Sequence, residues 1–92
     1  MKTVQRATAG TLESSDVLVE VEPCSGIVIE IESAVLPQFG DAIEGSVRDV
    51  LRALGVTDAR LHLMDRGALD CTLRARVEAA VRRAMRAEGG GR

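Results

Sequence analysis

Residues 17–32 read VLVEVEPCSGIVIEIE, two runs in which apolar side chains alternate with mostly acidic ones on either side of a short turn. Such alternation is typical of a β-strand with one buried face, and the proline and glycine within 23–26 are a turn signal. We therefore predict strands over 17–22 and 27–32 that pair as an antiparallel hairpin. The glutamates would line its solvent-exposed face, where solvation explains them better than cation binding does. They are Glu20, Glu22, Glu30 and Glu32.

The residues that follow change to the period of a helix. Apolar side chains recur at three- and four-residue intervals up to Leu54, Pro37 suits a first helical turn, and Gly55 suits the position after the last turn. We predict a helix over residues 37–54 and, from renewed alternation, a third strand over residues 59–64.

The final segment, residues 69–88, fits two patterns at its start. Residues 69–74 alternate as a strand would, whereas the whole segment recurs at helical spacing and is rich in alanine and arginine. Its length favours a helix, and a fourth strand before a shorter helix stays open. The order β-β-α-β-α predicts an α+β fold, a small two-layer sandwich in which two helices pack on one face of a mainly antiparallel sheet. The first dozen residues can add an edge strand.

Length and composition narrow the class of protein. Ninety-two residues with 46% hydrophobic and 28% charged side chains suit one folded domain, which we place at residues 1–88 with a flexible glycine-rich tail at 89–92. Phe39 is the only aromatic residue, so the chain lacks the stacking platforms of single-stranded nucleic-acid binders. Residues 66–92 hold seven arginines against three acids. A solvated helix face explains them better than a nucleic-acid site does.

Cysteine and histidine are too few for a metal site or a catalytic set. Cys24 and Cys71 have no CxxC partner, and His62 is the only histidine. We therefore expect no zinc site and no catalytic triad, and His62 fits a satisfied surface histidine. The chain also lacks a signal peptide and an apolar run of about 20 residues, which a membrane span needs. We expect a cytoplasmic protein with reduced cysteines and no membrane contact.

The segment before the first long strand has a different character. Residues 9–16 read AGTLESSD and place two hydroxyls, those of Ser14 and Ser15, between acids in a turn that we predict to be exposed. Taken by themselves, these residues fit a plain turn. An exposed loop serine is also what a covalent carrier needs. The attached arm must swing between active sites, and the attaching enzyme must reach the hydroxyl.

Three blocks of the chain resemble the acyl carrier protein, or gamma chain, of citrate lyase. They are AGTLESSDV at 9–17, QFGDAI at 38–43 and DRGALDCTLRARVEA at 65–79, and they occur in the same order as in that family. The similarity as a whole runs over nearly the full length of this chain. The resemblance implies an acyl carrier subunit of citrate lyase with no catalytic residue of its own. It also implies a covalent 2′-(5″-phosphoribosyl)-3′-dephospho-CoA arm, joined through a phosphodiester to Ser14, that carries acetyl and citryl thioesters.

The same resemblance implies three protein partners. The alpha subunit, a CoA-transferase, would exchange acetyl for citryl on the arm, the beta subunit, a citryl lyase, would cleave the citryl group, and a prosthetic-group transferase would attach the arm. One hypothesis is that arginines of the last segment face the phosphates of the arm or an acidic partner surface. They are Arg74, Arg76, Arg82, Arg83 and Arg86.

Two positions depart from the pattern of that family. Ser15 stands where many relatives have glycine, which leaves a second hydroxyl beside Ser14, and Pro37 stands where a polar or basic residue is common. Two alternative functions stay open. One is the carrier subunit of a malonate decarboxylase, and the other is a non-catalytic module that binds RNA or protein through the basic C-terminal segment.

Overall fold

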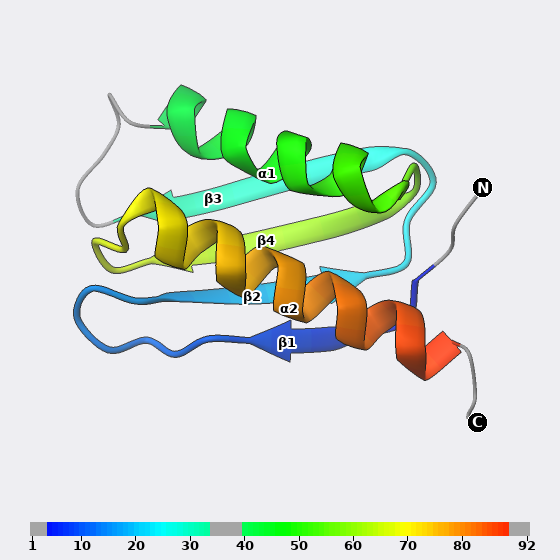
Figure 1. Ribbon diagram of the computed structural model, residues 1–92, viewed down its shortest axis with the longest axis horizontal. Helices are drawn as coiled ribbons and strands as arrows, with labels where there is room; N and C mark the ends of the chain where they lie inside the picture. The colour runs from blue at the N-terminus through cyan, green and yellow to red at the C-terminus, as the bar shows by residue number, and fades with distance from the viewer. Residues whose placement is uncertain (1–3, 34–39, 89–92) are drawn as a thin grey trace.

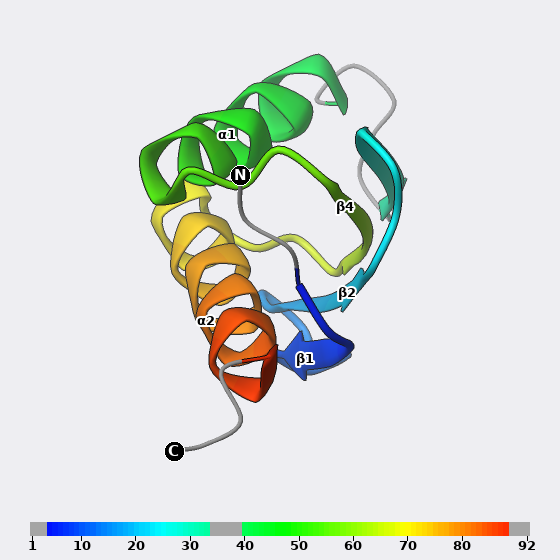
Figure 2. The ribbon, with the colours of Figure 1, turned by 90° about the vertical axis from the view of Figure 1, so that its right-hand side faces the viewer.

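The computed structural model describes residues 4–33 and 40–88. These residues contain four strands and two helices (Figure 1). Both helices cover the same face of the sheet, as the side view in Figure 2 shows. The elements in chain order are β1 (Ala7–Ala9), β2 (Val17–Glu22), β3 (Ile27–Ser33), α1 (Gly40–Leu54), β4 (Ala59–Asp65) and α2 (Asp70–Glu88).

The predicted α+β class and the two helices on one face are confirmed. The additional strand near the N-terminus is β1, which forms one edge of the sheet by pairing with β2. Helix α2 begins at Asp70, so residues 70–74 are helical and the alternative of a fourth strand there is excluded. Helix α1 ends at Leu54 as predicted. The predicted start of this helix at Pro37 and the predicted tail at 89–92 lie outside the described residues.

The predicted hairpin between the two long N-terminal strands is wrong. The strand order is β1-β2-β4-β3, so β4 lies between β2 and β3. It pairs antiparallel with β2 and parallel with β3. Helix α1 is therefore the crossover of a β-α-β unit, which places β3 and β4 side by side in the same direction.

The register explains why the hairpin does not form. In a hairpin closed by residues 23–26, Val19 would lie opposite Glu30. Residues directly opposite one another share a face of the sheet, so the apolar row of one strand would continue into the glutamates of the other. With β4 inserted, Val19 pairs with Leu63, and Leu63 pairs with Ile31. The apolar rows of all three strands then lie on the inner face.

The outer face of the sheet is charged, and its central histidine is satisfied. His62 lies between glutamates of the two neighbouring strands, with Nδ1 3.3 Å from Glu20 and Nε2 2.7 Å from Glu32. The hydrogen bond with Glu32, followed by the one with Glu20, raises the pKa of His62 above 6.5 against the opposing effect of burial. The prediction of a satisfied surface histidine is confirmed.

The core fills the space between the inner face of the sheet and the helices. Its largest fully buried side chains come from β2, β4 and α2, joined by one residue each from α1 and the N-terminal segment. Each of these side chains contributes about 1.5–3 kcal/mol when removed from water. Together these side chains hold the sheet and the helices in place, and the candidate site lies in a loop at one end of that sheet. They are Val17, Val19, Val21, Leu61, Leu63, Val77, Val81, Val47 and Val4.

Candidate functional site

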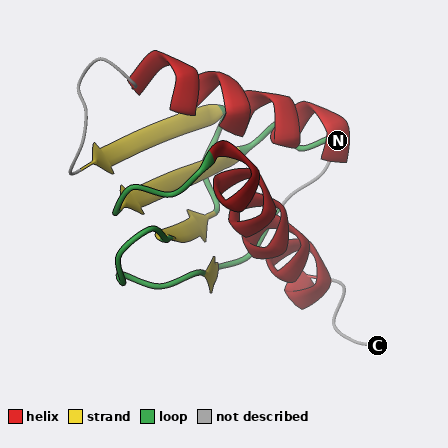
Figure 3. Cartoon of the chain, turned by 60° about the vertical axis from the view of Figure 1, so that its left-hand side comes forward, coloured by secondary structure: helices red, strands yellow, loops and turns green. Residues whose placement is uncertain are grey.

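Ser14 lies in the loop that connects β1 with β2, at the end of the sheet where β4 ends and α2 begins (Figures 1 and 3). Residues 13–16 form a tight turn in which the Asp16 N–H donates to the Glu13 carbonyl at 3.2 Å. Ser14 and Ser15 occupy its two central positions, and both are exposed. The prediction of an exposed turn at these residues is confirmed.

Asp16 fixes this turn to the body of the domain. Its side chain is nearly buried and accepts hydrogen bonds from the Thr11 hydroxyl at 2.8 Å and the Val17 N–H at 2.7 Å. The Arg76 guanidinium, from α2, donates to both carboxylate oxygens, at 2.9 and 3.1 Å. Arg76, then Thr11 and the Val17 N–H, lower the pKa of Asp16 from 3.8 to about 2. The carboxylate is therefore ionised at neutral pH and ties the loop to the helix.

Gly10 allows the loop to begin close to the strand that it joins. Its φ of +93° lies in the region that favours glycine, and a Cβ at this position would lie 1.8 Å from the carbonyl oxygen of Val17. The aliphatic part of Arg76 would be 3.4 Å from the same Cβ. The sequence alone indicates only a loop glycine at position 10. The structure shows that a side chain there would collide with the backbone of Val17.

The end of β4 holds the other side of the turn. The Ser15 N–H donates to the Arg66 carbonyl at 2.8 Å, and the Arg66 N–H donates to the Asp16 carbonyl at 2.9 Å. Ser15 has a φ of +65°, a conformation that glycine adopts without strain and that is uncommon for other residues. The hydroxyls of Ser14 and Ser15 are both exposed and both lack a hydrogen-bond partner among the described residues. The two serines differ in their backbones, because that of Ser15 is bonded to Arg66 and that of Ser14 is not.

Most arginines of α2 have partners within the described chain. Arg74, Arg76 and Arg82 bind carboxylates, and Arg83 donates to the backbone carbonyl of Thr8. Of these four, Arg76 contacts the Ser14 loop, and it does so through Asp16. The pair joins residues 60 positions apart, so no local pattern in the sequence announces it.

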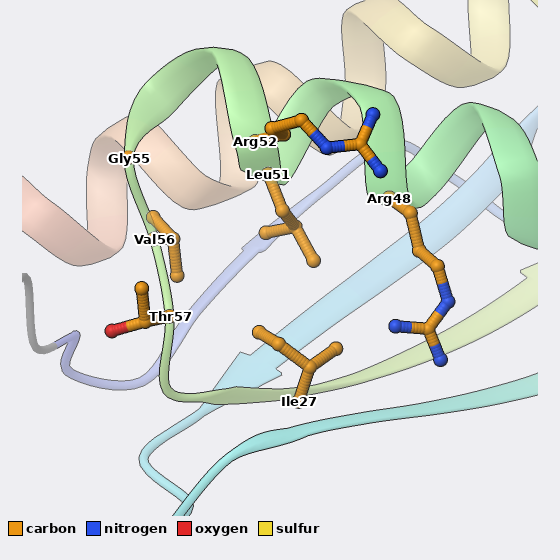
Figure 4. A pocket seen from close by; sticks show the side chains of 7 residues that line it. All are labelled: Ile27, Arg48, Leu51, Arg52, Gly55, Val56 and Thr57. Atoms are coloured by element: carbon orange, nitrogen blue, oxygen red, sulfur yellow. The ribbon is translucent and has the colours of Figure 1, made fainter.

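A hollow lined by residues of β3, α1 and the α1–β4 connection lies at the opposite end of β4 from Ser14. Its volume is about 370 Å³. Figure 4 shows apolar side chains of Ile27 and Leu51 directed toward one another, with Arg48 and Arg52 beside them. The β4 strand separates this hollow from the Ser14 loop, so the two are distinct features.

Within residues 4–33 and 40–88, no group of three or more histidine, cysteine, aspartate or glutamate side chains is arranged to hold a metal ion. Cys24 and Cys71 are free thiols. None of the described helices is both long enough and apolar enough to cross a membrane.

Comparison with known proteins identifies relatives over most of the chain. The sequence model of the family described as Malonate decarboxylase delta subunit (MdcD) matches residues 4–84. The citrate lyase acyl carrier protein of Haemophilus influenzae (strain PittGG) is 56% identical over 84 residues, 91% of this chain and 88% of its own. That of Escherichia fergusonii is 55% identical over 86 residues, 91% of this chain and 89% of its own.

A solved structure shares the fold. A chain of a Pseudomonas malonate decarboxylase hetero-tetramer in complex with malonate matches with a TM-score of 0.75 and 18% identity, over 90% of this chain and 91% of that chain.

The class defined by these findings is that of the acyl carrier proteins. Within the wider malonate decarboxylase delta subunit family, this chain belongs to the citrate lyase acyl carrier proteins, as the three sequence blocks predict.

Proposed function

We propose that this chain is the carrier subunit of a citrate lyase and that it carries acetyl and citryl groups on an arm joined to Ser14. The observation that supports the proposal is a free, exposed Ser14 hydroxyl on a turn that Asp16 and Arg76 fix to α2. A carrier needs both properties. The attaching enzyme must reach the hydroxyl, and the base of the arm must stay in a defined place.

The turn suits the arm expected from the family resemblance, 2′-(5″-phosphoribosyl)-3′-dephospho-CoA held by a phosphodiester. A substituent on the Ser14 oxygen would project into solvent and displace no hydrogen bond between described residues. When bound, the arm supplies a terminal thiol that holds acyl groups as thioesters. The turn keeps the attachment point fixed, so tethering raises the effective concentration of the acyl group at the active sites of the partners.

The chemistry itself is assigned to the partners, which would be the CoA-transferase (alpha) and citryl lyase (beta) subunits. His62, the only histidine of the sequence, is not a general base for Ser14, because it lies on the outer face of the sheet and is bound to Glu20 and Glu32. A separate prosthetic-group transferase would recognise the turn and attach the arm.

The second candidate is the carrier subunit of a malonate decarboxylase, which would hold malonyl and acetyl groups on the same arm. The family description and the shared fold favour it. The identity of 55–56% with citrate lyase carriers, against 18% with the malonate decarboxylase chain, favours citrate lyase. An RNA-binding module has less support, because the ion pairs of α2 already occupy most of its arginines.

Intact-mass measurement of the chain purified from its native host tests the proposal. We expect an added mass equal to that of the arm, lost in Ser14→Ala and retained in Ser15→Gly. Glycine is the matched control at position 15, because it tolerates the φ of +65° and removes the neighbouring hydroxyl. An active lyase complex whose carrier has the bare mass of the polypeptide would contradict the proposal. A mass retained in Ser14→Ala and lost in Ser15→Gly would move the attachment point by one residue.

A further inference from the structure

Arg66 is the arginine beside the Ser14 loop whose side chain has no partner. Its backbone is bonded to both Ser15 and Asp16, whereas its guanidinium forms no ion pair or hydrogen bond with any described residue. Arg86, near the far end of α2, is the other described arginine in this condition. Because the backbone of Arg66 is bonded to this turn and its guanidinium is unpaired, Arg66 is a candidate for binding a charged group attached to the turn.

The charges around Ser14 show why a cation is needed. Glu13, the residue before Ser14, is exposed and has no cationic partner among the described residues. The charge of Asp16 is already balanced by Arg76. A phosphodiester on Ser14 would add a negative charge beside the Glu13 carboxylate, and the repulsion would disfavour it. Arg66 is the cation that the backbone hydrogen bonds bring to this turn and that no carboxylate has neutralised.

The surroundings of Arg66 leave its guanidinium available. Its side chain is exposed and borders a shallow hollow of about 170 Å³. Buried Asp65 is the nearest carboxylate in sequence, but it already accepts hydrogen bonds from the Ser33 hydroxyl and the Ala68 N–H, both at 2.9 Å. The other carboxylate in the hollow, Glu32, is bound to the imidazole of His62. The full lining of the hollow is Glu32, Ser33, Met64, Asp65 and Arg66.

We propose that Arg66 binds the phosphodiester at the base of the arm on Ser14, an inference that rests on the proposed function. The guanidinium presents paired N–H donors whose geometry matches two oxygens of a phosphate, and such charge-assisted bonds are among the stronger polar contacts. The contact balances the new charge beside Glu13. It also sets the direction in which the arm leaves the turn, so Arg66 acts as a positioning residue for the carrier.

Nuclear magnetic resonance of the full chain, with and without the arm, tests this inference. The Nε–H signal of Arg66, assigned with Arg66→Lys, should shift when the arm is attached, and the Nε–H signal of Arg86 should not. The ³¹P signal of the Ser14 phosphodiester should shift in Arg66→Gln and stay in place in Arg86→Gln, the matched control. Removing the contact should also slow enzymatic attachment of the arm about threefold to tenfold, with partial recovery in Arg66→Lys.

The outcomes separate this inference from the function on which it rests. If the arm is present on Ser14 but the Arg66 signal is the same in both forms and Arg66→Gln leaves the ³¹P signal unmoved, the arginine does not hold the phosphate. The carrier function then stands without it. If the chain from its native host carries no arm, both proposals fall together.

Discussion

Replacing Gly10 with alanine should cost much of the stability of the domain. The new Cβ would lie 1.8 Å from the carbonyl oxygen of Val17, whereas real Cβ contacts essentially never fall below 3.0 Å. The backbone must therefore move, and it cannot do so freely, because Val17 is fully buried. Adding the strain of an L-residue at φ +93° to the cost of forced overpacking gives about 2–6 kcal/mol of lost unfolding free energy.

Urea and thermal unfolding of the purified chain measure this loss, and Gly45→Ala is the matched control. Gly45 lies in α1, and a Cβ there would meet nothing within 4 Å. The control should gain about 0.5–1 kcal/mol from alanine's higher helix propensity. Gly10→Ala should lower the melting temperature by roughly 10 °C or more. If Gly10→Ala unfolds at the same urea concentration and temperature as the wild type, the close approach of the loop to Val17 does not hold the loop in place.

Two predictions concern pH. The folded-state pKa of Asp16, about 2, lies below the unfolded value of 3.8, so its interactions stabilise the fold above about pH 3.8 and are lost as the pH falls toward 2. In Arg76→Gln the pKa of Asp16, followed by ¹³C resonance of its carboxyl, should rise toward 3.8; a value still near 2 would assign the shift to other donors. The pKa shift of His62 has the opposite sign to that of Asp16. The pKa of His62 is raised, chiefly by Glu32, so its contribution is complete below pH 6.5 and is lost as the pH rises through the folded-state value. His62→Gln should flatten the stability profile over that range in urea titrations, and an unchanged profile would contradict the assignment.

Periodicity alone predicts most of the elements of this fold, because each strand buries one row of side chains and each helix one stripe. The alternation in residues 17–22 and 59–64 and the helical spacing that ends at Leu54 all have counterparts in the structure. The strand order was not predictable in the same way. A short turn between two alternating runs suggests a hairpin, and the register conflict between Val19 and Glu30 becomes visible only when the pairing is written out residue by residue.

The candidate site, too, was predictable from the sequence only in part. An exposed turn around Ser14 follows from residue types that favour turns, and the attachment chemistry comes from the family resemblance. The contacts that hold the turn could not be predicted, because Asp16 meets Arg76 from a segment 60 residues away. The role of Gly10 also depends on tertiary contact, since the atom that excludes a side chain belongs to Val17 in the neighbouring strand.

The dependence of the Ser14 turn on Arg66 and Arg76 has a consequence for the newly made protein. Synthesis reaches the turn early, but its partners on β4 and α2 are added after most of the chain has been made. Until Arg76 has left the ribosome, the serine belongs to a segment without its tertiary hydrogen bonds. A transferase that recognises the ordered turn would therefore modify only chains that are complete and folded. Attachment of the prosthetic group would then depend on prior folding.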